Sequence, residues 1–358
     1  MRIAVDFLLS RIAWAFREEG LPVSWGEGRH LRRVMGVTVA ADVSELVIAL
    51  RRQGCSQGQK NRKRWSRATK YGLLPDSSME SMTILSEPLT AARDVAAKSA
   101  HRAALNLRPL SSREEFAAAS DLLAGIWGTS RDASPLSSDL LRSLSHADGC
   151  VMGALSGEEV VGIAVAVSGP PVSDVMYSLI AGVKSAFAGR GVGIALKYAQ
   201  RVWSLERGAN RMLWTYDPLI RRNAHFNLVR LGAQVQEYIP EFYPPMHDAL
   251  NRKDRTDRIC VSWDLVSATQ SLPADDDGPV ALYAEENGEP HRTGIVPRHS
   301  MRVWIPRDIE AMRLQDNALA MRWRIAMADV LQEAEAQGLV PVSVSVGGYY
   351  VLEQVAAA

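Results

Sequence analysis

Residues 187 to 199 read Phe-Ala-Gly-Arg-Gly-Val-Gly-Ile-Ala-Leu-Lys-Tyr-Ala and place clustered glycines directly before a long amphipathic run. An apolar run with strand character, Val175 to Val183, precedes them, and apolar residues recur at helical spacing after them until Gly208. At such a helix N-terminus we expect the backbone N–H groups of Gly191 to Ala195 to point outward without a partner, where the helix dipole favours an anion. The segment therefore predicts a phosphate-binding turn, with a purely structural glycine turn as the alternative.

The spacing of the glycines excludes two common phosphate-binding motifs. A Walker loop needs Gly-Lys followed by Ser or Thr, which is absent. A dinucleotide fingerprint spaces its glycines as G-x-G-x-x-G, whereas Gly189, Gly191 and Gly193 alternate. What remains is Arg190-x-x-Gly193-x-Ala195. This form resembles the coenzyme A loop of the GNAT acyltransferases.

The resemblance continues in the segments that follow. A strand at Arg211 to Asp217 and a second helix ending at Gly232-Ala233 resemble the elements that close a GNAT core. Four blocks are similar to a subfamily of predicted bacterial GNAT proteins: Trp214-Thr-Tyr-Asp-Pro-Leu219, Arg222-Asn-Ala-His-Phe-Asn-Leu228, Leu231-Gly-Ala233 and Asp257-Arg-Ile-Cys-Val-Ser-Trp263. The likeness covers residues 105 to 355.

The resemblance implies an α/β (α+β) fold, in which a mixed, mostly antiparallel central sheet is flanked by helices. We expect this acyltransferase core at residues 105–266. A helical, basic extension at 1–104 precedes it, and a small α/β extension at 279–358 follows it after a linker at 267–278.

The pattern of the core region predicts alternating strands and helices. A strand is expected at 106–109, a capping box at 111–115 that opens a helix to 127, and another helix at 135–146. A hairpin is expected from 151–155 and 160–167, followed by the strand at 175–183. In the C-terminal extension we expect a long helix ending at Gly338, two short strands at 341–346 and 349–352, and aromatic residues that pack in a core.

Composition fits a globular chain with ample core. Of 358 residues 47% are hydrophobic and 23% are charged, and no apolar run approaches the ~18 residues of a membrane span. Asp6 and Arg11 interrupt the N-terminal apolar stretch, so it does not fit a signal peptide, and a cytoplasmic protein without a membrane partner is expected. The three cysteines are widely spaced, which supports neither a disulfide framework nor a metal site.

The ends of the chain differ in charge. Residues 1–80 carry 14 basic and 8 acidic side chains, whereas 266–358 carry 7 basic and 13 acidic. The basic segment Gln57 to Lys70 resembles a helix-turn-helix in its polar spacing, but Lys60, Asn61 and Arg64 stand where such a motif needs apolar residues. A solvated linker is therefore favoured over nucleic-acid binding, and whether residues 1–78 belong to the natural product stays open.

What is known of GNAT enzymes implies a cofactor site here. In that family the pyrophosphate of acetyl-CoA lies on the glycine-loop amides, the pantetheine runs between two splayed strands, and an amine attacks the thioester in a ternary complex. Carried over, pyrophosphate would be bound by Arg190, Gly191, Val192, Gly193, Ile194 and Ala195, and pantetheine by the backbone of Ile180, Ala181, Gly182 and Val183. Asn223 would hydrogen-bond the cofactor or cap a turn, and the alternative for Arg190 is a surface charge. Acetyl-CoA or another short acyl-CoA is the expected co-substrate, with no metal.

An alkylammonium acceptor must lose a proton before it attacks, which costs about 4 kcal/mol at pH 7, and a positioned general base restores much of the rate. Asp217, at the end of its strand, is the first candidate for this base, with an N-cap of the following helix as the alternative. His225 is a second candidate, with a surface histidine as the alternative.

Two positions depart from the family pattern. Many GNAT enzymes carry a tyrosine that protonates the thiolate four residues before the final helix glycine, and here that position is Leu228. Tyr177 and Leu179 stand where the subfamily carries histidines. Tyr177 or Tyr216 could supply the acid instead, with core packing as the alternative for each.

The sequence thus predicts an acyltransferase that moves an acetyl or other short acyl group from coenzyme A to an amine of a small molecule. A non-catalytic acyl-CoA-binding or sensor protein stays open, because the usual tyrosine is missing. A nucleic-acid-associated protein acting through residues 57–70 is the third reading. The acceptor and the oligomeric state, a homo-oligomer included, are left open.

Overall fold

The computed structural model describes residues 86–169, 174–244, 246, 248–251, 254–267, 275, 277–294 and 299–354. The described residues form two compact units. The first takes in 86–126, 130–169 and 180–203, and the second takes in 127–129, 174–179 and the described part of 204–354. The predictions for residues 1–78 and for Gln57 to Lys70 lie outside the described residues, as does most of the predicted linker.

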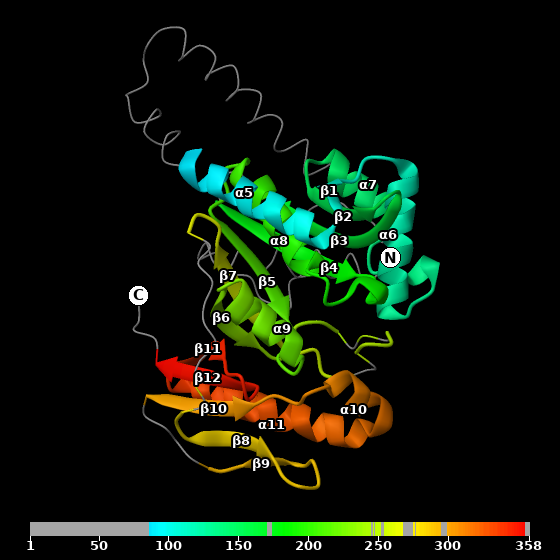
Figure 1. Cartoon of the computed structure of the whole chain (residues 1–358). Coiled ribbons are helices and arrows are strands. Elements are labelled where there is room, and N and C mark those ends of the chain that lie inside the picture. The colour runs from blue at the N-terminus through cyan, green and yellow to red at the C-terminus, as the bar shows by residue number, and fades with distance from the viewer. Residues whose placement is uncertain are drawn as a thin grey trace, which may run out of the picture. The chain divides into compact units, whose positions relative to one another are not determined.

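The first unit is built on a hairpin and a long helix (Figure 1). Strand β1 (Asn106–Pro109) pairs antiparallel with β2 (Cys150–Ser156), which forms the predicted hairpin with β3 (Glu159–Ser168). Helices α5 (Ser86–Ala103), α6 (Arg113–Trp127) and α7 (Ser138–His146) precede the hairpin, and a short 3-10 helix at Arg131–Ala133 stands between α6 and α7. The end of β4 (Val175–Val183), a 3-10 turn at Ser185–Phe187 and α8 (Val192–Leu205) complete the unit.

Helix α6 begins with the predicted capping box. The hydroxyl of Ser112 accepts a hydrogen bond from the amide of Glu115 at 3.1 Å, and the Glu115 carboxylate accepts from the amides of Ser111 at 2.8 Å and Ser112 at 3.1 Å. The hydrogen bond from Arg108, then the Ser111 amide, lower the pKa of Glu115 to about 2. These contacts satisfy amides that a helix start leaves without a partner.

Helix α8 packs directly on β3 at Gly162. A Cβ at this glycine would lie 3.1 Å from Leu196 and 3.1 Å from Val192, and both side chains are only 1% exposed. A side chain at this position would force these neighbours to shift by a few tenths of an ångström. The close packing fixes the first turn of α8 against the sheet.

The second unit holds the other half of the central sheet. The start of β4 pairs parallel with β5 (Arg211–Tyr216), and β7 (Arg258–Asp264) pairs antiparallel with both β5 and β6 (Gln234–Ile239). Helix α9 (Arg221–His225) continues into a turn of π-helix at Phe226–Arg230. Strand β4 belongs to both units, and the seven strands follow the order β1-β2-β3-β4-β5-β7-β6. The predicted mixed sheet flanked by helices is confirmed.

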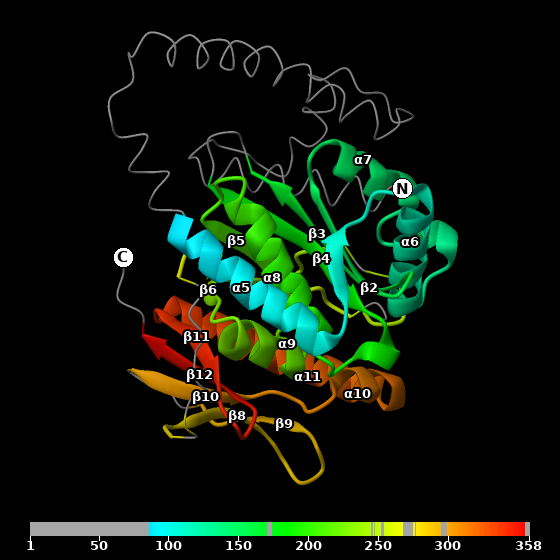
Figure 2. The same ribbon diagram turned by 45° about the horizontal axis from the view of Figure 1, so that its top comes forward.

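The second unit also contains a sheet of five strands, in the order β11-β12-β10-β8-β9. Its strands are β8 (Val280–Ala284), β9 (Pro290–Arg292), β10 (Ser300–Trp304), β11 (Leu339–Val344) and β12 (Tyr349–Gln354). Helices α10 (Ile309–Gln315) and α11 (Asn317–Ala336) lie between β10 and β11 in sequence, and α11 runs along the sheet in both views (Figures 1 and 2). Trp323 and Met327 of α11, and Leu282, Val303 and Tyr350 of the strands, are fully buried.

Several elements were not expected from the sequence. The predicted order placed one strand after the last core helix, whereas the structure has two, because β6 also forms. β8, β9, β10 and α10 were not foreseen either. β6 has the short, partly polar sequence Gln-Val-Gln-Glu-Tyr-Ile, in which apolar alternation is too weak to predict a strand.

Candidate functional site

The glycine turn reverses the chain between β4 and α8. Gly189 and Gly191 have φ angles of 75° and 83°, a region that side-chain-bearing residues avoid. Val192, Ala195 and Leu196, each 1% exposed, then anchor the start of α8 in the core. Gly189, Arg190 and Gly191, which precede this anchored start, are exposed.

Backbone amides of the turn are available to an anion. The amides of residues 191 to 194 donate to no other residue in the described part of the chain, as expected for the first N–H groups of a helix. The amide of Ala195 differs from the sequence-based expectation, because it donates to the carbonyl of Gly191 at 3.1 Å. Four consecutive donors, rather than five, therefore remain.

The space over the turn is open. A Cβ at Gly189 would meet no heavy atom of the described residues within 4 Å, and one at Gly191 would meet only Ile194, at 4.0 Å. Arg190 is exposed, and its guanidinium carbon lies 5.2 Å from the ring centroid of Phe187. Among the described residues Arg190 forms no ion pair. The turn thus combines four amide donors, an unneutralised guanidinium and room for a ligand, which fits a pyrophosphate group.

The end of β4 carries the residues predicted to meet pantetheine. The pairing between β4 and β5 covers Val175 to Tyr177 in the second unit. Ile180 to Val183 belong to the first unit, together with the glycine turn. Ala181 is exposed and Ile180 and Val183 are half-buried. The structure therefore brings the predicted pyrophosphate and pantetheine residues into one unit.

Asn223 and His225, on α9, and Tyr177, on β4, lie in the second unit and are each half-buried. The amide of Asn223 donates to the carbonyl of Ile220 at 2.9 Å. Burial, and then the charge of Arg230, lower the pKa of His225 below its usual value. His225 is therefore a neutral imidazole at pH 7, the form that accepts a proton.

Asp217 lies in a buried ion-pair cluster that the sequence did not predict. We call Asp217, Asp254, Arg313 and Arg324 the buried cluster. Arg324 donates to the two oxygens of Asp217 at 2.9 Å and 2.8 Å, and Arg313 donates to Asp217 at 2.9 Å. Asp254 accepts from Arg313 at 2.8 Å and from Arg324 at 3.0 Å. All four side chains are at most 6% exposed.

The buried cluster decides the protonation of Asp217. Burial alone would raise the pKa of this carboxyl, but the guanidinium groups of Arg324 and Arg313 hold it well below its usual range. One carboxylate oxygen also accepts a hydrogen bond from the amide of Leu219 at 2.9 Å, which holds the turn after β5. A carboxylate engaged in this way has little affinity for a further proton, so Asp217 is a poor general base.

The candidate acids differ in burial. Leu228, where many GNAT enzymes have tyrosine, is fully buried. Tyr216 is 5% exposed and burial raises the pKa of its hydroxyl, whose oxygen lies 3.4 Å from that of Tyr350. Tyr216 therefore packs in the core, whereas Tyr177 is half-buried.

Lys197, in α8, was not singled out from the sequence. Its side chain is 4% exposed, and burial lowers the pKa of its ammonium group to about 7. The signal that could have found it is a charged residue between the apolar Leu196 and Tyr198 on a helix that packs on a sheet.

Comparison with known proteins gives similarity in fold only. The sequence matches no known family profile and no curated protein. Solved structures of acetyltransferases, however, resemble part of its backbone, over 44% to 49% of the chain. The chain is similar in fold to GNAT acetyltransferases.

Three of these structures illustrate the similarity. An N-acetyltransferase from Staphylococcus aureus has 13% identity and a TM-score of 0.38, over 45% of this chain and 98% of that one. A putative acetyltransferase from Salmonella typhimurium, solved with acetyl-CoA, has 15% identity and a TM-score of 0.37, over 45% and 94%. An aminoglycoside 6'-acetyltransferase has 16% identity and a TM-score of 0.36, over 45% and 97%.

Two features are absent from the described residues. No helix there is both long and apolar enough to cross a membrane. No group of three or more His, Cys, Asp or Glu side chains is placed there to hold a metal ion.

Proposed function

We propose that this protein is an acyl-CoA-dependent N-acyltransferase that transfers an acetyl or other short acyl group to an amine of a small molecule, by direct transfer in a ternary complex. The observation that carries the proposal is the glycine turn, with four amide donors at residues 191 to 194 and open space above them. Together with the sequence resemblance of the four blocks, this turn fits the pyrophosphate of coenzyme A.

Each part of the proposed cofactor site has a separate task. The amides of residues 191 to 194 and the guanidinium of Arg190 hold the pyrophosphate. The backbone of Ile180 to Val183 pairs with the pantetheine amides and so orients the acyl group. Asn223 is the proposed additional hydrogen-bonding partner of the cofactor. When bound, the coenzyme supplies an activated thioester.

In the proposed reaction the acceptor nitrogen loses two protons and the departing thiolate gains one. His225 accepts the first proton, that of the acceptor ammonium, at its unprotonated ring nitrogen, because its lowered pKa favours the neutral imidazole. Tyr177 donates a proton from its phenol oxygen to the departing thiolate, and the proton that the nitrogen releases as the amide forms restores this phenol. Asp217 supports the end of β5 through the buried cluster and takes no part in proton transfer.

The test is acetyl-CoA binding measured by calorimetry on the intact chain, on Gly191→Val and on Gly208→Val. Gly208 is a matched control, because it lies just after the other end of α8, has a φ of 78°, and a Cβ there would meet no atom of the described residues within 4 Å. Both substitutions cost about 1–2 kcal/mol in backbone strain. We expect Gly191→Val to weaken binding at least about tenfold and Gly208→Val to leave it within about twofold, because only the first fills the proposed phosphate site.

The outcome decides the next step. Micromolar binding that is lost only in Gly191→Val makes a screen of amines for release of free thiol worthwhile. If the intact chain binds neither acetyl-CoA, nor longer acyl-CoAs, nor free coenzyme A, the glycine turn is structural and the proposal is wrong.

A non-catalytic acyl-CoA-binding protein is the second candidate. Two residues favour this reading. Leu228 cannot donate a proton, and Asp217 is held in the buried cluster. Both candidates bind coenzyme A, and only the enzyme releases free thiol when an acceptor amine is added.

A further inference from the structure

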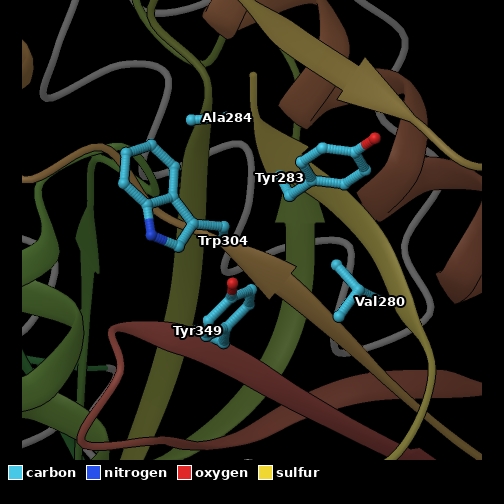
Figure 3. Close-up of a pocket in the computed structure, with 5 residues that line it drawn as sticks. All are labelled: Val280, Tyr283, Ala284, Trp304 and Tyr349. Carbon is cyan, nitrogen blue, oxygen red and sulfur yellow. The ribbon is translucent and has the colours of Figure 1, made fainter. Parts of the chain in front are cut away.

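The five-stranded sheet carries a pocket lined mostly by aromatic side chains. Its volume is about 480 Å³, and its lining residues are Val280, Tyr283, Ala284, Trp304 and Tyr349 (Figure 3). All five lie in the second unit and are half-buried. The volume falls in the range of sites for small organic ligands.

Strand pairing explains why these residues meet. Trp304 of β10 lies directly opposite Tyr349 of β12, and Val280 of β8 lies opposite Arg302 of β10. Val303 and Tyr350, the neighbours of Trp304 and Tyr349 in the sequence, are fully buried. The ring centroid of Trp304 also lies 5.1 Å from that of Trp323 on α11, so strand pairing and a buried helix side chain both hold this wall of the pocket.

Two polar groups in the pocket wall are free to bind a ligand. The indole nitrogen of Trp304 and the hydroxyl of Tyr349 form no hydrogen bond with another described residue, and the hydroxyl of Tyr349 points toward the side where Trp304 lies (Figure 3). The hydroxyl of Tyr283 points away (Figure 3). Both free groups can donate a hydrogen bond, and the indole N–H can only donate.

The charges beside Trp304 and Tyr349 are positive, whereas the ring of Tyr283 lies 4.9 Å from that of His291, which pairs with Glu285. The guanidinium carbon of Arg221 lies 4.9 Å from the ring centroid of Trp304, and that of Arg302 lies 5.1 Å from the centroid of Tyr349. Arg221 donates to the carbonyl of Ile305 at 2.8 Å, a neutral acceptor, and it pairs with no carboxylate of the described residues. Its charge is therefore not neutralised by an acidic partner. Arg307 adds a third positive charge close enough to lower the pKa of Arg221, after the larger effect of burial.

We propose that this pocket binds a small planar aromatic molecule that carries an acidic group. The ring of the ligand packs among Tyr283, Trp304 and Tyr349, and its acidic group lies toward Arg221 and the two hydrogen-bond donors. This site is separate in sequence from the glycine turn and does not depend on the proposed transfer reaction.

A cationic ligand is the obvious rival for an aromatic pocket, because Trp and Tyr faces attract ammonium groups. Here two of the three rings already carry a guanidinium group within about 5 Å. A second cation would meet their repulsion, whereas an anion would relieve it. The charge arrangement therefore selects against the cation and for the acid.

The test uses three probes of nearly the same shape with the intact chain. 2-Naphthoate carries a negative charge, 2-naphthamide is neutral and 2-naphthylmethylamine is positive at pH 7. Binding is followed by the fluorescence anisotropy of the naphthalene ring. We expect naphthoate to bind with a dissociation constant on the order of 10–500 µM, at least about fivefold tighter than naphthamide, with the amine weakest.

Variants locate the binding. Ala284→Phe fills the pocket and is expected to weaken naphthoate binding at least about tenfold, whereas Leu314→Phe, which adds a ring at a residue 62% exposed on α10, is expected to leave it unchanged. Arg221→Gln removes the charge and can still donate to Ile305. It should lower the preference for naphthoate over naphthamide by roughly threefold or more, without weakening naphthamide binding.

The proposal is overturned if naphthoate does not bind the intact chain, or binds no better than naphthamide. These two outcomes need no variant, so a misfolded Ala284→Phe chain leaves the proposal testable. It is also overturned if folded Ala284→Phe, checked by its thermal transition, binds naphthoate as the intact chain does.

Discussion

His225 is the residue on which the proposed proton transfer most directly depends. Its imidazole is half-buried beside Arg230, and both burial and that charge disfavour the protonated ring. At pH 7 a lysine at its usual pKa would be almost fully protonated, and a carboxylate at its usual pKa would be almost fully deprotonated. A neutral imidazole offers an available lone pair on a ring nitrogen, which is what general-base catalysis needs.

We predict that His225→Gln lowers kcat for acyl transfer by about 10²-fold or more, because the glutamine amide cannot accept the proton. In the unmodified protein the rate should fall as the pH decreases through the pKa of His225, which burial and the charge of Arg230 lower from its usual value. The rate of thiol release, measured as a function of pH in both proteins, tests the loss of kcat and the pH dependence. The binding of acetyl-CoA should stay within about twofold, and a kcat within twofold of the unmodified value would show that the proton leaves by another route.

The role of a single residue could be predicted from the sequence where its partners are close to it in the chain. The glycine turn and the capping box at Ser112 and Glu115 are local patterns, so both could be predicted. The buried cluster could not, because Asp217 and Arg324 are 107 positions apart. A weaker signal existed, since Arg324 follows Trp323 on a face of α11 that is otherwise apolar and so had to have a partner.

Helix α11 shows how the contribution of an arginine to stability depends on its position on the helix. Arg322 pairs with Glu289 in an exposed ion pair, where the side chains are 46% and 36% exposed. Arg324, two positions along, is 1% exposed and bonds to both Asp217 and Asp254. Solvent screens the first pair, whereas loss of the second would leave two carboxylates buried with one arginine between them.

We therefore predict that Arg324→Met lowers the free energy of unfolding by about 3–5 kcal/mol, and that Arg322→Met lowers it by less than about 1 kcal/mol. The two substitutions remove the same charge from the same helix and introduce the same side chain, so helix propensity cancels between them. Urea denaturation of both variants measures the difference. Equal losses would mean that the buried ion pairs of Arg324 contribute no more to stability than the exposed pair of Arg322.

Elements with a strong period could be predicted and short ones could not. α6, α8 and α11 have long apolar faces, and β2, β3 and β4 are continuous apolar runs, so each was expected close to its observed bounds. β9 has three residues and β6 alternates polar residues with half-buried ones. Their pairing with neighbouring strands, rather than any property of their own sequence, makes them strands.

At the scale of the whole molecule, the division into two units does not follow the order of the predicted segments. β5 to β7 and the C-terminal sheet lie in one unit. The buried cluster explains this grouping, because Asp217 and Asp254 come from the segment of the central sheet and Arg313 and Arg324 come from α10 and α11. Tyr350 of β12 adds a hydrogen bond to the carbonyl of Pro218 at 2.9 Å.

A chain that ends at residue 278 should therefore lose the fold of β5 to β7 as well as the segment removed. The truncation takes away both arginines and leaves the buried carboxylates of Asp217 and Asp254 without their ion-pair partners, a cost that the remaining contacts of one half-sheet cannot offset. Hydrogen exchange resolves the two units separately. We expect the amides of β5, β6 and β7 to exchange rapidly in the truncated chain, while β2 and β3, in the first unit, keep most of their protection.

In the intact chain the amides of both groups of strands should be protected from exchange. If β5 to β7 remain protected after truncation, this half of the central sheet is stable without α10 and α11, and the buried cluster is then an attachment point for the C-terminal sheet rather than a condition for the fold.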